Sequence, residues 1–498
     1  MAQKEAGLAA MSGGSKAKPH AVVVVYPLQG HVIPVTHLAL RLAARGFAIT
    51  VVNTEAVHDQ TARARRRPGG ARLLCRCALL GDGRALRAYQ RRPPRGVRPV
   101  AAPRRVHGLI VPSALWPRRG GARSCRRRPG RDVPPRRHLL RVTGDTGQEV
   151  QYRDMITHIP GAPAIEPHEL MSYLQETDTT NVVHRILYKA FEEARGADYV
   201  LCNTMEELEP STIVALRAEK PFYAVGPIFP AGFAHSAVAT SMWAESNCSH
   251  WLDAQPLGSV LYISFESYAH VTKQELHEIT GGVLASGARF LWVMRPDIVS
   301  SDDPDPLSEG FAAASAGRGL VVPWCCLMTH KYRGSIVVLS ISKSVELNEE
   351  QKEMLSGFQQ AQNSGCRHSP SLCKLVEVLS HAALDGFLTH CGWNSLLESV
   401  WSGVPMLCFP LLTHQFTNRR LVVREWHVGV PIGDRGAVFA DEVRARIEGV
   451  MSGKEGEELR EAVKKVRATL EAATAHGGSS QRSFDKFVHE LMRCCGGC

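Results

Sequence analysis

The sequence has 498 residues, of which 44% are hydrophobic, and it carries a formal net charge of +11. This length exceeds what one ordinary core supports, so two domains are expected. No stretch approaches the ~20 apolar residues that span a bilayer, and residues 1–19 lack the apolar centre of a secretory signal and are expected to be disordered. We therefore expect a soluble, cytoplasmic protein.

The positive charge is concentrated in residues 61–140, which contain 23 Arg, no Lys and 10 Pro. Asp82 and Asp132 are the acidic residues of this block, so it carries +21 and the remainder of the chain carries −10. The block has few aromatic residues and no sustained period, so little regular structure is expected there.

Three interpretations of this block compete. It could be a solvated insert, an Arg-rich nucleic-acid arm or a stretch translated in the wrong frame. The nucleic-acid interpretation lacks interleaved aromatic residues and a recognisable module. We favour the frame error, because GC-rich codons read out of frame give Arg without Lys, and because the α/β pattern returns abruptly near Gln151.

The 14 cysteines form no regular framework. Pairs such as Cys75 and Cys77, or Cys325 and Cys326, lack the spacing to His partners that zinc sites show. In a reducing compartment they are expected to be free thiols, and no bound metal is expected.

The predicted N-terminal domain, residues 20–235, opens with a β-α-β unit. Ala21–Tyr26 is an unbroken apolar run typical of a buried strand. After the turn PLQGH, apolar residues from Val35 to Leu42 recur at helical spacing, and Gly46 ends that helix. Phe47–Val52 is the next strand, so a doubly wound sheet is indicated.

Beyond the Arg-rich block the same α/β rhythm returns. The predicted elements are helix Val182–Ala194, strand Tyr199–Cys202, helix Met205–Leu216 and strand Phe222–Val225. A polar stretch follows, and residues 236–258 are predicted to be the interdomain linker.

The predicted C-terminal domain, residues 259–475, repeats this organisation. Its elements are strand Ser259–Phe265, helix Lys273–Ala285, strands Arg289–Met294, Gly319–Pro323 and Gly386–Thr389, helix Asn394–Trp401, strand Val404–Phe409, and helices Thr417–Glu425, Glu442–Met451 and Gly456–Ala473. Residues 327–374 interrupt the rhythm and offer one plausible helix, Glu349–Gln359. Residues 476–498 form a last helix near Ser480–Met492.

The segment His381–Gln415, HAALDGFLTHCGWNSLLESVWSGVPMLCFPLLTHQ, carries the clearest chemistry. A strand ends at Thr389, Gly392 allows a tight turn, and a helix follows. A helix N-terminus offers N–H groups without partners and the positive end of a dipole, which suits a phosphate. By itself the pattern also fits an ordinary strand–turn–helix with a packed Trp393.

This segment closely resembles the signature of the plant secondary-product UDP-glycosyltransferases, family 1 enzymes of the GT-B fold. The family signature starts at a Trp, runs through HCGWNS and GVP, and ends in an acid–Gln pair about 44 residues on. Here Trp324 to Gln415 covers 92 positions, and the surplus of 48 matches residues 327–374, which therefore resemble an insertion such as a retained intron. The resemblance covers roughly residues 20–58, 150–326 and 375–492. It implies two doubly wound Rossmann-like domains that face each other across a cleft.

The resemblance also implies site residues. In the family, UDP-sugar is held by the residues that match Ser267, Trp324, His390, Trp393, Asn394, Ser395, Glu398, His414 and Gln415. Trp324 would stack on uracil, Ser267, His390, Asn394 and Ser395 would hold the diphosphate, and Glu398 the ribose. Trp393 would line the sugar, and Gln415 would bind its hydroxyls.

PLQGH resembles the turn of the family's catalytic base, which makes His31 the base. The tail from Gly477 to Phe487 resembles the helix that crosses back to the N-terminal domain.

The sequence departs from the family at several positions. Glu266 stands where the family has Gly beside the phosphates, and a carboxylate there would repel them. His414 stands where an Asp usually accepts from glucose hydroxyls, and Asp385 replaces a small residue. The Gln expected after Trp324 is missing, and the Asp that orients the catalytic His should lie in the Arg-rich block, where Asp132 is merely the nearest candidate.

The function implied by the resemblance is inverting transfer of glucose from UDP-glucose to a hydroxyl of a small hydrophobic acceptor of the flavonoid or phenolic class. The partners would be the two small molecules, without nucleic acid, metal or cofactor, and the protein would be a monomer. Asp303–Pro304–Asp305 resembles a metal-binding D-x-D but lies in a Pro-rich acidic loop. The alternative is an impaired relative or defective gene product that retains part of a UDP-binding domain. A dinucleotide oxidoreductase is disfavoured, because PLQGH has one Gly where that fingerprint needs three.

Overall fold

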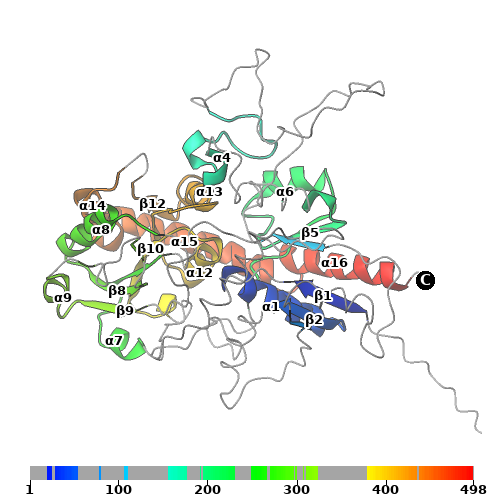
Figure 1. The fold of residues 1–498 in the computed structure, drawn as a ribbon, viewed down its shortest axis with the longest axis horizontal. Helices are drawn as coiled ribbons and strands as arrows, with labels where there is room; N and C mark the ends of the chain where they lie inside the picture. Colours follow the sequence, from blue (N-terminus) through cyan, green and yellow to red (C-terminus); the bar gives the residue numbers. More distant parts are fainter. Residues whose placement is uncertain are drawn as a thin grey trace, which may run out of the picture.

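The structure is a computed structural model. It describes residues 19–24, 29–53, 78–79, 106–109, 155–175, 191, 194–229, 248–265, 270–295, 298–299, 307, 310–323, 378–433 and 437–496. These residues form two α/β units, which are joined by the last two helices of the chain (Figure 1).

The first unit contains short parallel strands. One sheet has the order β1 (His20–Val24), β2 (Ala48–Asn53), β3 (Ala78–Leu79), and the other has the order β4 (Val106–Leu109), β5 (Tyr199–Cys202), β6 (Phe222–Ala224). Helix α1 (Gln29–Ala44) connects β1 to β2, and Gly46 takes a φ of 91° directly after it. The predicted β-α-β opening is therefore confirmed, although the helix starts inside PLQGH rather than after it.

Strands β3 and β4 lie within the Arg-rich block, residues 61–140. They pair in parallel with β2 and β5, respectively, and they are short, so they leave the expectation of little regular structure there as a prediction. Val106–Leu109 reads VHGL, which has only two large apolar residues and therefore gives little strand signal within an Arg- and Pro-rich block. The rest of the block, and residues 327–374 with their predicted helix, lie outside the described residues.

Between β4 and β5 the chain forms a short segment of turns. It contains a 3-10 helix, η2 (Pro167–Glu169), and one helical turn, α4 (Ser172–Gln175). Ile156, Ile165 and Leu170 form a small apolar cluster beneath it. Helix α6 (Pro210–Arg217) then precedes β6. It begins later than predicted, because Pro210 occupies its first turn, where a missing N–H costs nothing.

The second unit is built on a six-stranded parallel sheet of order β12-β11-β10-β7-β8-β9. Its strands are β7 (Val260–Ser264), β8 (Arg289–Met294), β9 (Gly319–Pro323), β10 (Leu384–Thr389), β11 (Met406–Cys408) and β12 (Gly429–Pro431). Every residue of β7 is buried, as expected for a central parallel strand covered on both faces.

Helices cover both faces of this sheet. They are α8 (Lys273–Ala285), α9 (Phe311–Ala314), α12 (Trp393–Ser402), α13 (Gln415–Arg420) with the π-helical turn η4 (Leu421–Glu425), α14 (Ala440–Ser452) and α15 (Lys454–Thr474). Two apolar clusters result. One is centred on Phe387, Leu396 and Val463, and the other on Ile263, Phe290 and Val443.

Helix α7 (Ser249–Asp253) corrects another expectation, because it lies inside the predicted linker 236–258. Leu252 of this helix is 2% exposed and packs into the core of the second unit. Cys248, which precedes the helix, is disulfide-bonded, so the expectation of free thiols fails there. Cys202, Cys391 and Cys408 are free and buried.

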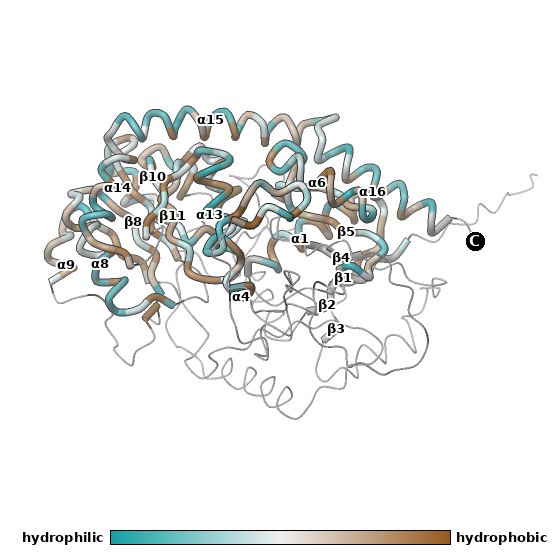
Figure 2. The backbone as a smooth tube through the Cα atoms, turned by 90° about the horizontal axis from the view of Figure 1, so that it is seen from above, coloured by the Kyte–Doolittle hydropathy of each residue, from teal (hydrophilic) through white to brown (hydrophobic). Residues whose placement is uncertain are grey.

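The chain ends in α16 (Ser479–Gly496), which follows α15 and lies along the first unit (Figures 1 and 2). Phe484 and Phe487 are each 1% exposed and share a cluster with Leu42 and Phe47. Tyr223 of β6 donates a hydrogen bond of 2.5 Å to Glu490. The last helix therefore completes the core of the first unit.

Candidate functional site

The turn between β10 and α12 is tightly built. Cys391 has a φ of 63°, and Gly392 is the N-cap of α12. A Cβ on Gly392 would lie 2.3 Å from Nε2 of His390, so a larger residue there would displace the imidazole, and His390 is 9% exposed. The predicted strand–turn–helix is present, with His390 held against the turn.

The first turn of α12 contains Trp393, Asn394 and Ser395 and no acidic residue. The first backbone N–H groups of a helix have no intrahelical acceptor, and they carry the positive end of the helix dipole. Asn394 and Ser395 are partly exposed. This end of α12 has the chemistry of an anion site, at the carboxyl edge of a parallel sheet, where such folds bind ligands.

The side chain of Trp393 is buried where the two units meet. It is 2% exposed, and its Nε1–H donates a hydrogen bond of 2.6 Å to the carbonyl of Asn203, from the first unit. Its ring lies 5.8 Å from that of Trp426. The indole therefore packs between the two units, and the prediction that Trp393 lines the sugar stays a prediction.

Glu398 lies one turn further along α12 and is partly exposed. Burial raises the pKa of its carboxyl from 4.5 to about 8. Burial, with a smaller contribution from Glu398, also raises the pKa of the neighbouring Tyr262. Near pH 7 the carboxyl is thus mostly protonated, and it can both donate and accept hydrogen bonds.

Helix α13 packs against the turn between β10 and α12. Asn418 donates a hydrogen bond of 2.7 Å to the carbonyl of Cys391. Gln415 is fully buried, and its Oε1 accepts hydrogen bonds from the backbone N–H groups of Leu411 (2.8 Å) and Leu412 (2.9 Å). The Gln415 oxygen therefore shapes its own loop, and the predicted contact with sugar hydroxyls stays a prediction.

His414 is the N-cap of α13 and is partly exposed. Its Nδ1 lies 3.2 Å from Oγ1 of Thr413, a residue with a φ of 57°. An imidazole thus occupies the position where the resemblance predicts a carboxylate, next to a strained residue.

The predicted base, His31, lies in the first turn of α1 and is partly exposed. His37 of the same helix is 3% exposed, and burial lowers its pKa to about 4, so it stays neutral in the core. Of these two histidines, His31 is the one with access to solvent. That it shares a cleft with His390 stays a prediction.

Several predicted residues lie outside the described residues. They are Ser267, Trp324, Glu266, Asp132 and the Asp303–Pro304–Asp305 loop. Their expected roles stay predictions.

Asp385 does not belong to the site. It lies near the start of β10, whereas the anion site follows the other end of that strand. Its Oδ2 lies 2.7 Å from NH1 of Arg460 in α15. The ion pair with Arg460 accommodates Asp385 at the end of β10 opposite the anion site.

Sequence reasoning missed Asn203, which links the two units. It follows β5, its Nδ2 lies 3.4 Å from Oδ1 of Asn394, and its Oδ1 accepts from the N–H of Ile228 at 2.8 Å. An Asn directly after a buried strand was the available signal, since the carboxyl ends of parallel strands form binding edges.

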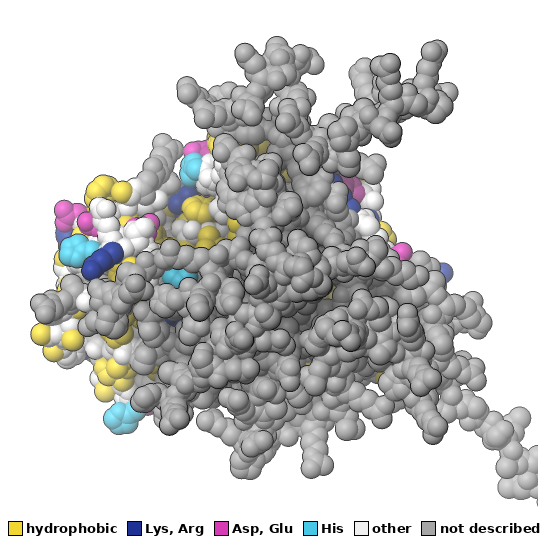
Figure 3. Space-filling view, viewed as in Figure 1, with side chains coloured by type: hydrophobic (Ala, Val, Ile, Leu, Met, Phe, Trp, Pro, Cys, Tyr) yellow, Lys and Arg dark blue, Asp and Glu magenta, His cyan; other side chains and the backbone are white. Residues whose placement is uncertain are grey.

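The described part of the chain contains no group of three or more His, Cys, Asp or Glu side chains arranged to hold a metal ion. Nor does any described helix have the length and apolar character needed to cross a membrane. On the face in Figure 3, the described side chains over the second unit mix hydrophobic, acidic, basic and histidine groups, with no continuous Lys and Arg patch among them.

Comparisons with known proteins agree with this geometry. The family model "UDP-glucoronosyl and UDP-glucosyl transferase" matches residues 373–455, which include the β10–α12 turn. UDP-glycosyltransferase 86A1 of Arabidopsis thaliana is 38% identical over 525 residues, covering 97% of this chain and 96% of the relative. (R)-mandelonitrile beta-glucosyltransferase of Prunus dulcis is 27% identical over 96% of this chain and 98% of that protein.

Solved structures show the same fold. Phytolacca americana UGT2, complexed with UDP-2fluoro-glucose and pterostilbene, superposes with a TM-score of 0.67 at 23% identity, covering 95% of this chain and 99% of that one. Os79 from O. sativa in complex with UDP has a TM-score of 0.66 at 22% identity, covering 94% and 100%. The two α/β units are thus the Rossmann-like domains of a GT-B fold, and the chain belongs to the plant family 1 UDP-glycosyltransferases.

Proposed function

We propose that this protein transfers glucose from UDP-glucose to a hydroxyl of a small hydrophobic acceptor of the flavonoid or phenolic class, with inversion at the anomeric carbon. The observation that carries the proposal is the N-terminus of α12, where Gly392, Asn394 and Ser395 offer an anion site free of acidic side chains. The relatives' names support glucose and a small acceptor, since one glucosylates (R)-mandelonitrile by name and one was solved with UDP-2fluoro-glucose and pterostilbene.

In this mechanism a neutral His31 accepts the proton of the acceptor hydroxyl while that oxygen attacks the anomeric carbon. The bond from this carbon to the diphosphate oxygen breaks, and UDP leaves with the electron pair. Its negative charge is stabilised by the N–H groups that begin α12 and by His390. The described thiol nearby, Cys391, takes no part, because burial holds its pKa well above the ordinary value.

Glu398 would accept hydrogen bonds from the ribose hydroxyls, and His414 with Gln415 would face the sugar. Trp324 would stack on uracil, and Ser267 would contact a phosphate. No metal or cofactor is needed in this scheme, because helix N–H groups and side chains supply the stabilisation. We further propose a cytoplasmic monomer, which light scattering would detect near 54.6 kDa.

The test is an assay of UDP release with UDP-glucose and a panel of phenolic acceptors, in which the glucoside is identified by mass spectrometry and its anomer by NMR. We expect β-glucoside formation that is insensitive to EDTA. Substitution His31→Asn should lower kcat by about 10²–10⁴-fold and leave UDP affinity unchanged, as expected for loss of a general base.

The proposal of an impaired relative is tested in the same assay. A repaired chain would lack residues 327–374 and carry Glu266→Gly, His414→Asp and the alternative reading frame across 61–140. Turnover by the repaired chain alone would support impairment, and equal turnover by both would contradict it. If neither chain releases UDP, the glucosyltransferase proposal fails.

A further inference from the structure

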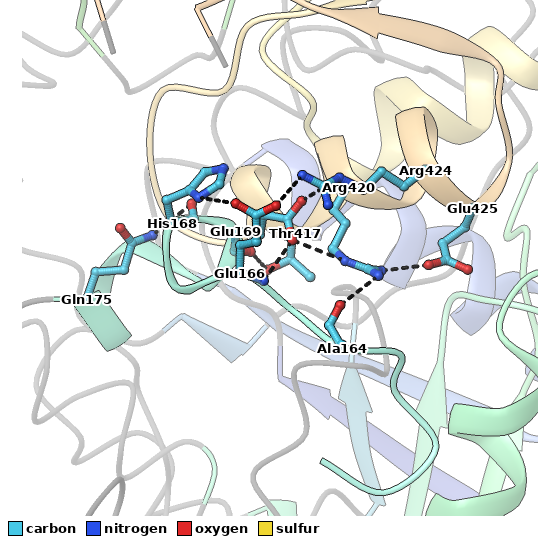
Figure 4. A network of polar contacts seen from close by, with 9 residues as sticks. All are labelled: Ala164, Glu166, His168, Glu169, Gln175, Thr417, Arg420, Arg424 and Glu425. Atoms are coloured by element: carbon cyan, nitrogen blue, oxygen red, sulfur yellow. Dashed lines mark hydrogen bonds and ion pairs between the residues drawn. The ribbon is translucent and has the colours of Figure 1, made fainter. Parts of the chain in front are cut away.

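The segment that contains η2 and α4 belongs to the first domain but contacts α13 of the second (Figure 4). Its beginning is fixed to the first domain, because Thr212 of α6 donates a hydrogen bond of 2.7 Å to the carbonyl of Gly161. Its end is fixed to the second, because Thr417 of α13 donates a hydrogen bond of 2.7 Å to the carbonyl of Glu169. The segment therefore bridges the two domains.

Two carboxylates of this segment pair with two arginines of the second domain. Glu169 is 2% exposed, and its oxygens lie 2.9 Å from Nε of Arg424 and 3.3 Å from Nε of Arg420. Glu166 lies 2.8 Å from NH2 of Arg424. Arg420 also donates a hydrogen bond of 3.1 Å to the carbonyl of Ala164. A buried carboxylate with two guanidinium partners fixes orientation as well as distance.

The same segment also contacts the residue before His414. The N–H of Ser172 donates to the carbonyl of Thr413 at 3.0 Å, and the N–H of Thr413 donates to Oγ of Ser172 at 2.9 Å. Thr413 has a φ of 57°, which a β-branched residue adopts only when its surroundings enforce it. Ser172 thus holds the backbone that places His414 and Gln415.

We propose that Glu166, Glu169 and Ser172 form an interdomain clamp with Thr413, Arg420 and Arg424, and that this clamp positions the His414–Gln415 turn for the sugar of the donor. Glu169 and Ser172 are positioning residues in this proposal, since they act through the turn. The inference rests on the proposed UDP-sugar transfer. It implies that a residue pair of the first domain tunes affinity for the sugar and leaves affinity for UDP to α12.

The effect of the clamp on sugar binding can be separated from its effect on UDP binding, because the two parts of the donor contact different elements. UDP alone would contact the residues of α12 and Trp324, whereas glucose would contact the turn that begins α13. Loosening the turn should therefore weaken binding of UDP-glucose and hardly change binding of UDP. A merely structural defect would weaken both.

The experiment uses the full chain and the variants Ser172→Ala and Glu169→Gln. Calorimetry should show Kd for UDP-glucose raised about 5- to 10-fold, as expected for one lost hydrogen bond or charge-assisted contact, with Kd for UDP within about twofold of wild type. In steady-state kinetics, KM for UDP-glucose should rise, while KM for the acceptor should stay unchanged.

Asp385→Asn is the matched control for Glu169→Gln, because it removes one carboxylate from the Asp385–Arg460 ion pair away from the turn. Ser480→Ala is the control for Ser172→Ala, because Ser480 is a buried hydroxyl that hydrogen-bonds the carbonyl of Gly226. Neither control should change the ratio of the two dissociation constants.

Hydrogen exchange separates failure of the clamp from failure of the proposed function. In the ligand-free variants, amides of residues 411–417 should exchange faster, while those of β10 should not. Unchanged exchange there would overturn the clamp. Faster exchange with equal loss of UDP and UDP-glucose affinity would overturn its role toward the sugar. A wild-type chain that binds neither nucleotide would overturn the glucosyltransferase proposal and the sugar role with it.

Discussion

Glu398 shows how one partly buried carboxyl makes stability depend on pH. Its pKa is raised to about 8 in the folded protein by burial, against 4.5 ordinarily, so between these values the folded state binds more protons than the unfolded state. Stability is therefore greatest below pH 4.5 for this group and falls as pH rises through the window. Glu398→Gln should raise Tm at pH 8 by roughly 5–10 °C, because it removes a cost of roughly 2–4 kcal/mol, with a much smaller effect at pH 5.

The same substitution should weaken UDP binding by about 10-fold at pH 8, because a neutral amide replaces the acceptor of charge-assisted hydrogen bonds from ribose. Thermal scans and calorimetry at both pH values measure the two effects. Glu458→Gln, whose side chain is 69% exposed on α15, is the control and should change neither. A Glu398→Gln protein that is no more stable at pH 8 than wild type would contradict burial as the source of the shift.

At the scale of elements, the β10–α12 turn depends on Gly392. The added Cβ in Gly392→Ala would lie 2.3 Å from Nε2 of His390, so the imidazole must leave its place above the anion site. UDP affinity should fall by about 10-fold or more, as expected when a hydrogen-bond donor to a charged group is lost. Gly196→Ala is the control, because nothing lies within 4 Å of its added Cβ. Calorimetry with UDP measures both, and equal affinities would show that His390 is not needed there.

Elements defined by local patterns were predicted well. Helix α8 has its predicted bounds, and the structure shows why: Thr272 caps it and accepts a hydrogen bond of 3.1 Å from the N–H of Glu275. Strand β8 also matches, as an uninterrupted apolar run between turns. Strand β4 was missed because four residues with only two large apolar side chains, Val106 and Leu109, carry little signal inside an Arg-rich block.

The candidate site was predictable only where its residues are close in sequence. His390, Asn394, Ser395 and Glu398 lie on one turn and one helix, so spacing and resemblance could find them. The link between Asn203 and Asn394 spans 191 positions, and that between Ser172 and Thr413 spans 241. No period or motif records such contacts, because they arise only when two domains pack.

At the scale of the whole molecule, α16 holds the first domain together. Phe487 is 1% exposed and packs against Tyr199 and Tyr223, with ring centroids 6.0 and 5.4 Å away. Phe487→Ala should destabilise the first domain by about 3–5 kcal/mol, the range for a large aromatic removed from a core. Thermal unfolding followed by calorimetry should show one transition shifted to lower temperature. Met492 of the same helix is 39% exposed, so Met492→Ala should leave the transition temperature unchanged.

Arg45, which directly follows α1, and Asp485 of α16 form an ion pair although they are 440 positions apart. On the ribosome, at roughly 5–20 residues per second, that separation corresponds to roughly 20–90 s of synthesis. The second domain, contiguous from β7 to α15, can fold during this time. The strands of the first domain cannot complete their core until α16 has been synthesised, so a nascent chain that stalls before α16 leaves apolar strands open to chaperones and proteases.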